Sequence, residues 1–154
     1  MQPQYTPAFI ERFWSKVDRN GPIPEHRPDL GPCWLWTASV SRKGYGELGV
    51  KIDGVWKNRK AHRIAWEMEY GAISEDLVSD HLCRVRACVR PSHVEQVTNA
   101  VNVLRGDGPT AINASKTVCM YGHLNWRIRP VGTRDCRDCA QVRKRQRRRR
   151  NAEG

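Results

Sequence analysis

The segment LVSDHLCRVRACVRPSHVEQVTNAVNVLR, residues 77–105, carries the pattern on which the fold prediction depends. Residues 77–81 and 93–97 each predict a short strand, and the stretch between them predicts a loop. Residues 99–105 predict a helix, because threonine and asparagine stand at its start as capping residues and a glycine follows its end. The segment therefore predicts a strand, a loop, a second strand and a helix in immediate succession.

The residues before this segment predict a helix and a small sheet. Apolar side chains recur at three and four residues over 7–19, as they do in an amphipathic helix. Residues 47–52 predict a strand, and Asp53-Gly54 predicts the hairpin turn that follows it. Residues 61–70 predict a second helix, which Gly71 ends.

The residues after this segment are polar and basic. Residues 107–118 predict a polar connector, and residues 119–142 hold a group of cysteines with one histidine. The arginine-rich run at 143–150 has the composition of a helix, but its like charges favour disorder until a polyanion neutralises them.

The composition limits how the chain can be stabilised and where it acts. The chain has 154 residues, of which 39% are hydrophobic, and its mean hydropathy is −0.70. This fraction of apolar residues is modest for a hydrophobic core, so we expect metal ions or disulfides to stabilise the fold in addition. No apolar run approaches the roughly 18 residues of a membrane span, and Met1–Tyr5 lacks the basic-then-apolar form of a signal peptide. We therefore expect neither membrane insertion nor secretion.

The charge balance indicates the kind of partner. The 27 lysine and arginine residues exceed the 16 acidic residues, which gives a net charge of +11 and a pI near 9.9. Such an excess indicates a polyanionic partner, most simply nucleic acid. The charge is uneven, because residues 140–154 hold seven basic groups and one acidic group. More than half of the excess positive charge therefore lies in a tenth of the chain.

Four residues near the C-terminus have the spacing of a zinc site. Cys136 and Cys139 form a C-x2-C knuckle, and Cys119 and His123 lie 17 and 13 residues before Cys136. In a chain without a secretion signal, cysteines favour metal ligation or buried thiols over disulfides. Three thiolates and one imidazole suit tetrahedral Zn2+. The alternative is a set of unrelated thiols, but four ligand residues within 21 positions favour zinc.

A second set of ligand candidates lies within residues 77–105. It contains Cys83, Cys88 and His93, and Cys33 is the only cysteine left to join them. These four residues predict a second structural zinc site, which uses every remaining cysteine. The rival interpretation is a redox pair of Cys83 and Cys88, but their x4 spacing differs from the C-x-x-C of thiol oxidoreductases.

Four short motifs carry a resemblance to a known family: Asp80-His81-Leu82-Cys83, Cys88, Pro91-Ser92-His93 and Asn99-Ala100-Val101-Asn102. Their order and spacing resemble the His-Cys box of homing endonucleases, which is a branch of the HNH, or ββα-metal, nucleases. The flanks Cys33-Trp34-Leu35-Trp36, Gly44-Tyr45-Gly46 and Ala61-His62-Arg63 also resemble small HNH proteins of bacteriophages. The resemblance implies a small α+β fold, in which a zinc-stapled ββα-metal core combines an antiparallel sheet with short helices.

The resemblance also implies catalytic roles. His81 corresponds to the general base, and Asn102 to a ligand of one catalytic divalent ion, Mg2+ or Mn2+. HNH enzymes commonly carry an aspartate at the position of Asp80 as a second metal ligand. The chemistry agrees, because phosphodiester hydrolysis needs a base poised near neutral pH, and a hard cation prefers oxygen ligands. His93 has a rival role as the middle residue of the HNH motif, which steadies the base.

Basic residues supply the candidate contacts to DNA. The family places a cation near the scissile phosphate on the sheet before the core motif. The candidates there are Lys57, Arg59, Lys60 and Arg63, of which the two arginines are favoured. The alternative is that they are solvated surface charges. Phosphate contacts are expected from residues of the sheet, the zinc loop and the tail, namely Arg42, Lys43, Arg84, Arg86, Arg90, Arg143, Arg145, Arg147 and Arg148. The tail is expected to bind DNA in a salt-sensitive, sequence-independent manner.

The predicted function is a metal-dependent DNA endonuclease of homing or phage type, with two structural Zn2+ ions. The alternative is a non-catalytic, zinc-stapled regulator that binds DNA or RNA. We expect double-stranded DNA as the partner and the cytoplasm of a bacterial or phage-infected cell, at the nucleoid, as the location. A double-strand cut at a palindrome requires a two-fold dimer, whereas nicking requires only a monomer, and the sequence leaves both open.

We expect four segments along the chain. Residues 1–30 form an N-terminal helix and loop, 31–106 the nuclease core, 107–142 the second zinc-binding module and 143–154 the basic tail. His26 and His62 have no partner in the sequence and are expected to be structural or exposed.

Overall fold

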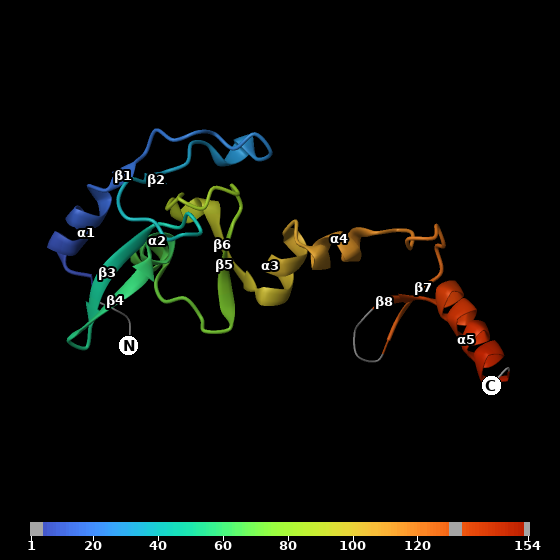
Figure 1. Ribbon diagram of the computed structural model, residues 1–154. Coiled ribbons are helices and arrows are strands. Elements are labelled where there is room, and N and C mark those ends of the chain that lie inside the picture. Colours follow the sequence, from blue (N-terminus) through green and yellow to red (C-terminus); the bar gives the residue numbers. More distant parts are fainter. Residues whose placement is uncertain (1–4, 130–133, 153–154) are drawn as a thin grey trace. The chain divides into compact units, whose positions relative to one another are not determined.

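The computed structural model describes residues 5–129 and 134–152, and the chain forms two compact units (Figure 1). Unit 1 is Met1–Asn102 and unit 2 is Val103–Gly154. Residues 1–4, part of the expectation about secretion, and residues 153–154, the end of the predicted tail, lie outside the described residues. Across the part of the chain that is described, no helix is both long and apolar enough to cross a membrane. The four-segment division stays a prediction.

The α+β fold class is confirmed, because short antiparallel strand pairs combine with helices. Unit 1 begins with α1 (Pro7–Trp14), capped by Thr6. The predicted helix over 7–19 is too long, because the chain becomes extended as β1 (Val17–Asp18) and pairs with β2 (Leu35–Trp36). This pairing is non-local, so no local sequence signal marks the end of the helix.

The central part of unit 1 agrees with the sequence prediction. β3 (Glu47–Ile52) and β4 (Val55–Lys60) form an antiparallel hairpin. Asp53 and Gly54 both have positive φ, 51° and 81°, as a two-residue type I′ turn requires. The helix α2 (Ala61–Tyr70) follows directly and ends at Gly71, whose φ is 90°. The core of unit 1 packs α1, β2, β3 and α2 together through the buried residues Phe13, Trp36, Val50, Ala61, Ile64, Ala65 and Val89.

Residues 77–105 form the two strands and the helix that the sequence predicts. β5 (Leu77–His81) pairs antiparallel with β6 (Val94–Thr98), and α3 (Asn99–Arg105) follows without a break. A short 3-10 turn, η2 (Pro91–His93), precedes β6, and another, η1 (Pro28–Leu30), precedes β2. In Figure 1 the two strands lie side by side, and α3 continues the chain from the end of β6. The ββα order expected from the sequence is thus the observed one.

Unit 2 contains two helices that the sequence analysis did not expect. The predicted polar connector contains α4 (Pro109–Ser115), which starts with proline at its first position. The hairpin of β7 (Trp126–Ile128) and β8 (Arg134–Cys136) leads into α5 (Arg137–Ala152). The expectation of disorder over 143–150 is therefore wrong for this structure. Arginine, glutamine and alanine are strong helix formers, and cations near a helix C-terminus are favoured by its dipole.

Candidate active site and metal clusters

The first cluster is Cys33, Cys83, Cys88 and His93, and the structure brings all four together. Their candidate ligand atoms lie within 4.8 Å of one another, and each side chain is at most 1% exposed. Nδ1 of His93 lies 3.6 Å from Sγ of both Cys33 and Cys88. Three of these residues, Cys83, Cys88 and His93, lie between β5 and β6. The fourth, Cys33, lies just before β2.

The surroundings of this cluster fit a bound zinc ion. Nε2 of His93 donates to the carbonyl oxygen of Leu30 at 2.9 Å, which leaves Nδ1 unprotonated and facing the sulfurs. Hydrogen bonding from Cys88 lowers the pKa of Cys83, whereas burial raises the pKa of Cys33. A low thiol pKa favours the thiolate, which is the form that binds metal. All six cysteines of the chain are free thiols, so both sets are open to metal rather than joined in disulfides.

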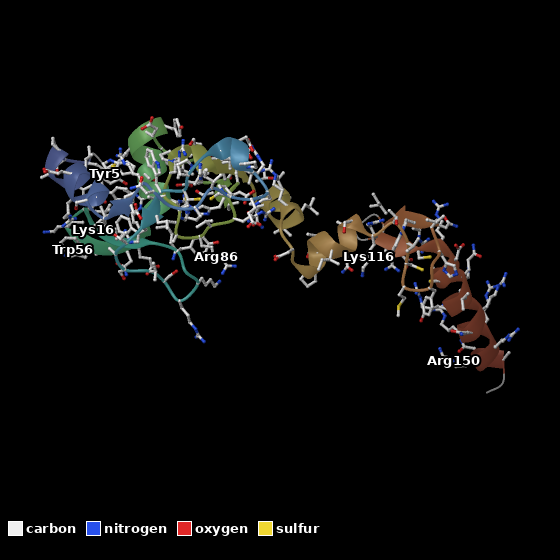
Figure 2. The ribbon with its side chains drawn as sticks, turned by 90° about the horizontal axis from the view of Figure 1, so that it is seen from above. Tyr5, Lys16, Trp56, Arg86, Lys116 and Arg150 are labelled. Carbon is white, nitrogen blue, oxygen red and sulfur yellow. The ribbon has the colours of Figure 1, made fainter. Side chains whose placement is uncertain are left out.

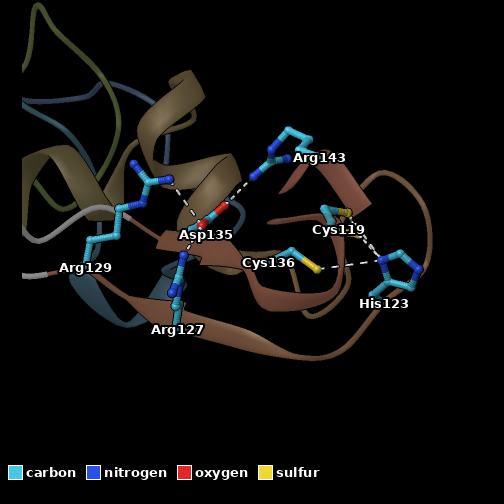
Figure 3. A network of polar contacts seen from close by, with 8 residues as sticks. Cys119, His123, Arg127, Arg129, Asp135, Cys136 and Arg143 are labelled. Atoms are coloured by element: carbon cyan, nitrogen blue, oxygen red, sulfur yellow. Dashed lines mark hydrogen bonds and ion pairs between the residues drawn. The ribbon is translucent and has the colours of Figure 1, made fainter. Parts of the chain in front are cut away.

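The second cluster is Cys119, His123, Cys136 and Cys139, and it also assembles (Figure 3). Nδ1 of His123 lies 3.4 Å, 3.6 Å and 3.3 Å from the three sulfurs of Cys119, Cys136 and Cys139 respectively. The amide of Tyr121 points to the sulfur of Cys119 at 3.4 Å, as amides do around metal-bound thiolates. Each cluster therefore offers the three sulfurs and one nitrogen that suit tetrahedral zinc.

His81 is the last residue of β5 and is 6% exposed. Its Nε2 lies 2.9 Å from the carbonyl oxygen of Cys88. A carbonyl oxygen can only accept a hydrogen bond, so Nε2 carries the proton and Nδ1 keeps a free lone pair. Burial lowers the pKa of His81 and so favours the neutral ring. The arrangement gives an oriented, neutral imidazole whose Nδ1 can accept a proton.

The two candidate ligands of a catalytic cation lie on β5, directly before His81, and on α3, which follows β6. Asp80 precedes His81 on β5 and is 8% exposed. Asn102 lies in α3 and is half-buried. Its side-chain amide has no hydrogen-bond partner among residues 5–129 and 134–152. A carboxylate and an amide oxygen are the donor types that Mg2+ takes from proteins.

His62 is a neighbour of His81 that the sequence analysis did not connect with the site. The two rings meet edge to face with centroids 4.6 Å apart, and Tyr45 lies 5.6 Å from His62 and 5.9 Å from His81. His62 is 5% exposed, and its Nδ1 has no partner within the described structure. Burial lowers its pKa to about 3. The sequence signals were its place in the flank Ala61-His62-Arg63 and its position in the first turn of α2, beside the core residue Ile64.

The two arginines expected near the scissile phosphate have different environments. Arg59 forms a bidentate ion pair with Glu67, at 2.8 Å and 2.5 Å, and also donates to the hydroxyl of Tyr5. Arg63 has no hydrogen bond or ion pair with any described residue. Both line a groove of about 1070 Å³ that also includes Trp56, but His81 and Asn102 are not among the residues lining it. Figure 2 labels Tyr5 and Trp56 on this unit.

The other basic candidates of unit 1 differ in their contacts and exposure. Arg90 donates to the carbonyl of Pro32 at 2.8 Å and stacks on Trp34, so its guanidinium is tied to the fold. Arg86 is exposed, lies over the ring of Tyr45 at 5.8 Å, and donates to the carbonyl of Lys43 at 3.3 Å. The remaining candidates of unit 1, Arg42, Lys43 and Arg84, are exposed.

Comparison with known proteins adds one match. Residues 59–104 match a family model described as HNH endonuclease. The matched residues run from the end of β4 through α2 and the ββα segment to α3 and include His81, the ligands Cys83, Cys88 and His93, and Asn102. No curated protein and no solved structure matches the chain. This match confirms the resemblance of residues 59–104 to HNH endonucleases, while the resemblance to the His-Cys box homing type and to phage proteins stays a prediction.

Proposed function

We propose that this protein is a metal-dependent endonuclease that hydrolyses phosphodiester bonds of double-stranded DNA, with His81 as the general base. The observation that carries the proposal is the hydrogen bond from Nε2 of His81 to the carbonyl of Cys88, inside the segment that matches HNH endonucleases. A general base must keep one ring nitrogen unprotonated and correctly oriented. The Cys88 carbonyl does this for His81, because it holds the proton on Nε2 and leaves Nδ1 able to accept one.

In the proposed reaction, Nδ1 of His81 takes a proton from a water molecule. The oxygen of that water forms a bond to phosphorus while the bond from phosphorus to the 3′-oxygen breaks. The leaving oxygen gains a proton from solvent, and the imidazolium of His81 returns its extra proton to solvent. Burial lowers the pKa of His81, and the hydrogen bond to the Cys88 carbonyl and the nearby charge of Asp80 offset this lowering only in part.

Asn102 and Asp80 are the residues that would hold a catalytic Mg2+ or Mn2+ ion. Such an ion stabilises the negative charge on the leaving oxygen when it is bound. The fit rests on the donor set, a carboxylate and an unengaged amide oxygen on neighbouring elements of one ββα unit.

The two clusters are proposed to hold structural Zn2+ ions. In the first cluster, the zinc would fix the loop that carries the Cys88 carbonyl, and thereby the ring of His81. Of the two arginines, we assign the scissile phosphate to Arg63, because the charge of Arg59 is already met by Glu67. The remaining backbone contacts are proposed to come from Arg42, Lys43, Arg84, Arg86, Arg90, and from Arg143, Arg145, Arg147 and Arg148 of α5.

The finer class of the enzyme is also a proposal. The order from His81 to Asn102 supports the His-Cys box type, and so a homing or phage-type nuclease. Such an enzyme would act in the cytoplasm on DNA of the nucleoid or of a phage. Monomeric nicking and dimeric double-strand cleavage would differ in their plasmid products, which the following experiment separates.

Supercoiled plasmid is incubated with the protein and Mg2+, beside His81→Ala and Asn102→Ala. The wild type is expected to produce nicked circles if it acts as a monomer and linear DNA if it cuts both strands. Both variants are expected to lose activity by about 100-fold or more. A wild type that binds the plasmid without cutting it over a range of substrates and salt would instead identify the zinc-stapled regulator.

A further inference from the structure

The second half of α5 has no packing partner within its own unit. Every residue from 141 to 152 is exposed, whereas Cys139, at the start of the helix, is buried. A helix that is polar on every side is only marginally stable alone, because most helical stability in proteins comes from packing. Figure 2 shows nitrogen-tipped side chains along this helix, up to the labelled Arg150.

The first two turns of α5 are anchored in two ways. Cys136 and Cys139 of the second cluster stand immediately before the helix and inside its first turn. In addition, Asp135 accepts from Arg127 at 3.0 Å, Arg129 at 3.2 Å and Arg143 at 2.9 Å (Figure 3). The contact from Arg143, which belongs to α5, ties the helix to the β7–β8 hairpin through this carboxylate.

Most cations of α5 remain unneutralised beyond this anchor. Arg143 is the only one of the 143–150 run that ion-pairs with a described residue. Six more, Lys144, Arg145, Arg147, Arg148, Arg149 and Arg150, have no acidic partner in the described part of the chain. Pairs four residues apart, such as Lys144 with Arg148 and Arg145 with Arg149, repel each other and destabilise an isolated helix.

We infer that α5 binds in the major groove of duplex DNA, with its two opposite faces on the phosphates of the two strands. The inference rests on the proposed DNA substrate and assigns α5 a binding mode. At about 100° per residue, Arg145 and Arg149 share one face, and Arg147 and Arg150 share a face roughly 150° away. A helix of about 10–12 Å diameter fits a groove about 12 Å wide, so cations on both faces reach phosphates at once. The absence of any pattern for base reading makes this attachment independent of sequence.

The test measures binding rather than cleavage, so it does not depend on catalysis. The full chain carrying His81→Ala is titrated with an end-labelled DNA duplex over a range of salt concentrations, and affinity is followed by fluorescence anisotropy. Two double variants are compared in this background, Arg145→Gln/Arg149→Gln and Arg147→Gln/Arg150→Gln. The matched control, Arg12→Gln/Lys116→Gln, removes two exposed cations that lie off α5.

Each α5 variant is expected to reduce the slope of log affinity against log salt by about 2, since each phosphate contact contributes about 0.9. Between about 50 and 200 mM salt, the parent should therefore lose roughly 12-fold more affinity than either variant. The control should leave the slope within about 0.5 of the parent value.

Three results would overturn the inference. An effect from only one of the two double variants would place α5 flat against a single strand. If both double variants keep the parent's slope of log affinity against log salt, α5 does not contact the DNA. Equal affinity and equal variant effects on double-stranded RNA would contradict major-groove binding, because the major groove of A-form RNA is too narrow for a helix. Failure of the proposed nuclease function would be visible separately, as a wild type that does not cut plasmid.

Discussion

Replacing Cys33 by serine removes the one ligand of the first cluster that lies outside the family-matched segment. Cys33 and Cys83 are 50 residues apart in the chain, so a metal ion bound to both closes a loop of about that length. Cys33 itself is 0% exposed, and its sulfur lies 3.6 Å from Nδ1 of His93. The substitution opens this loop while it leaves the volume of the side chain almost unchanged.

The expected cost follows from the entropy of loop closure. A cross-link that closes a loop of about 50 residues stabilises a fold by about 4 kcal/mol at 25 °C, on the chain-entropy model. Natural domains have a free energy of unfolding of about 5–15 kcal/mol, so this is a large share. With a urea dependence of about 1–2 kcal/mol per molar, the unfolding midpoint should fall by about 2–4 M.

Urea unfolding of unit 1 can be followed by tryptophan fluorescence, because five of the six tryptophans lie between positions 14 and 66. Zinc is measured in parallel by elemental analysis of the folded protein, with two ions per chain expected for the wild type and one for Cys33→Ser. Cys119→Ser is the matched control, since it removes a ligand in unit 2 and should leave the unit 1 midpoint unchanged. Two zinc ions and an unchanged midpoint in Cys33→Ser would refute the ligand assignment.

Three further predictions concern other parts of the chain. Because burial holds the pKa of His62 near 3, the unfolded chain takes up a proton below about pH 6.5 that the folded protein does not, so the free energy of unfolding should fall by up to about 1.4 kcal/mol per pH unit below 6.5. Urea titrations of His62→Phe at several pH values should show that this contribution is gone, and identical pH dependence in both proteins would contradict it. Arg63→Gln should slow cleavage about 10- to 100-fold at unchanged Tm, whereas Arg59→Gln should lower Tm by about 4–8 °C, because the Glu67 carboxylate loses its cationic partner and keeps only the hydroxyl of Tyr5; the reverse pattern in cleavage and melting assays would reverse the assignment. Cys139→Ser should retain one zinc ion and bind duplex DNA about 10-fold more weakly, and full affinity would show that the second cluster does not support α5.

Local signals in the sequence predicted most of unit 1. The Asp53-Gly54 turn and the glycine after Tyr70 define a turn and a helix end by backbone geometry, and the side chain of Thr98 accepts from the amide of Val101 at the start of α3. The two ligand sets were predicted because metal ligation restricts residue type so strongly that few combinations of Cys and His remain. The structure brings each set together as expected.

Non-local contacts explain what the sequence did not predict. The two-residue pairing of β1 with β2 ends α1 early, and it depends on residues about twenty positions apart. The contact between His62 and His81 joins α2 to β5, and periodicity cannot identify which helix side chain meets the base. Similarly, the pairing of Arg59 with Glu67 decides that this arginine is held within the fold, although both arginines looked equivalent in the sequence. In unit 2, charge repulsion suggested disorder, whereas helix propensity and the anchor at Asp135 and Cys139 favour α5.

The rate of DNA cleavage by His81→Gln tests the central claim most directly. Single-turnover cleavage is measured at saturating DNA, beside His26→Gln, which changes an exposed histidine that bonds the neighbouring carbonyl of Leu82. Both variants should keep two zinc ions and wild-type DNA affinity. His81→Gln is predicted to be slower than the wild type by about 100- to 10,000-fold, and His26→Gln to cut at nearly the wild-type rate. A His81→Gln protein that cleaves within about threefold of the wild type would contradict the assignment of His81 as the general base.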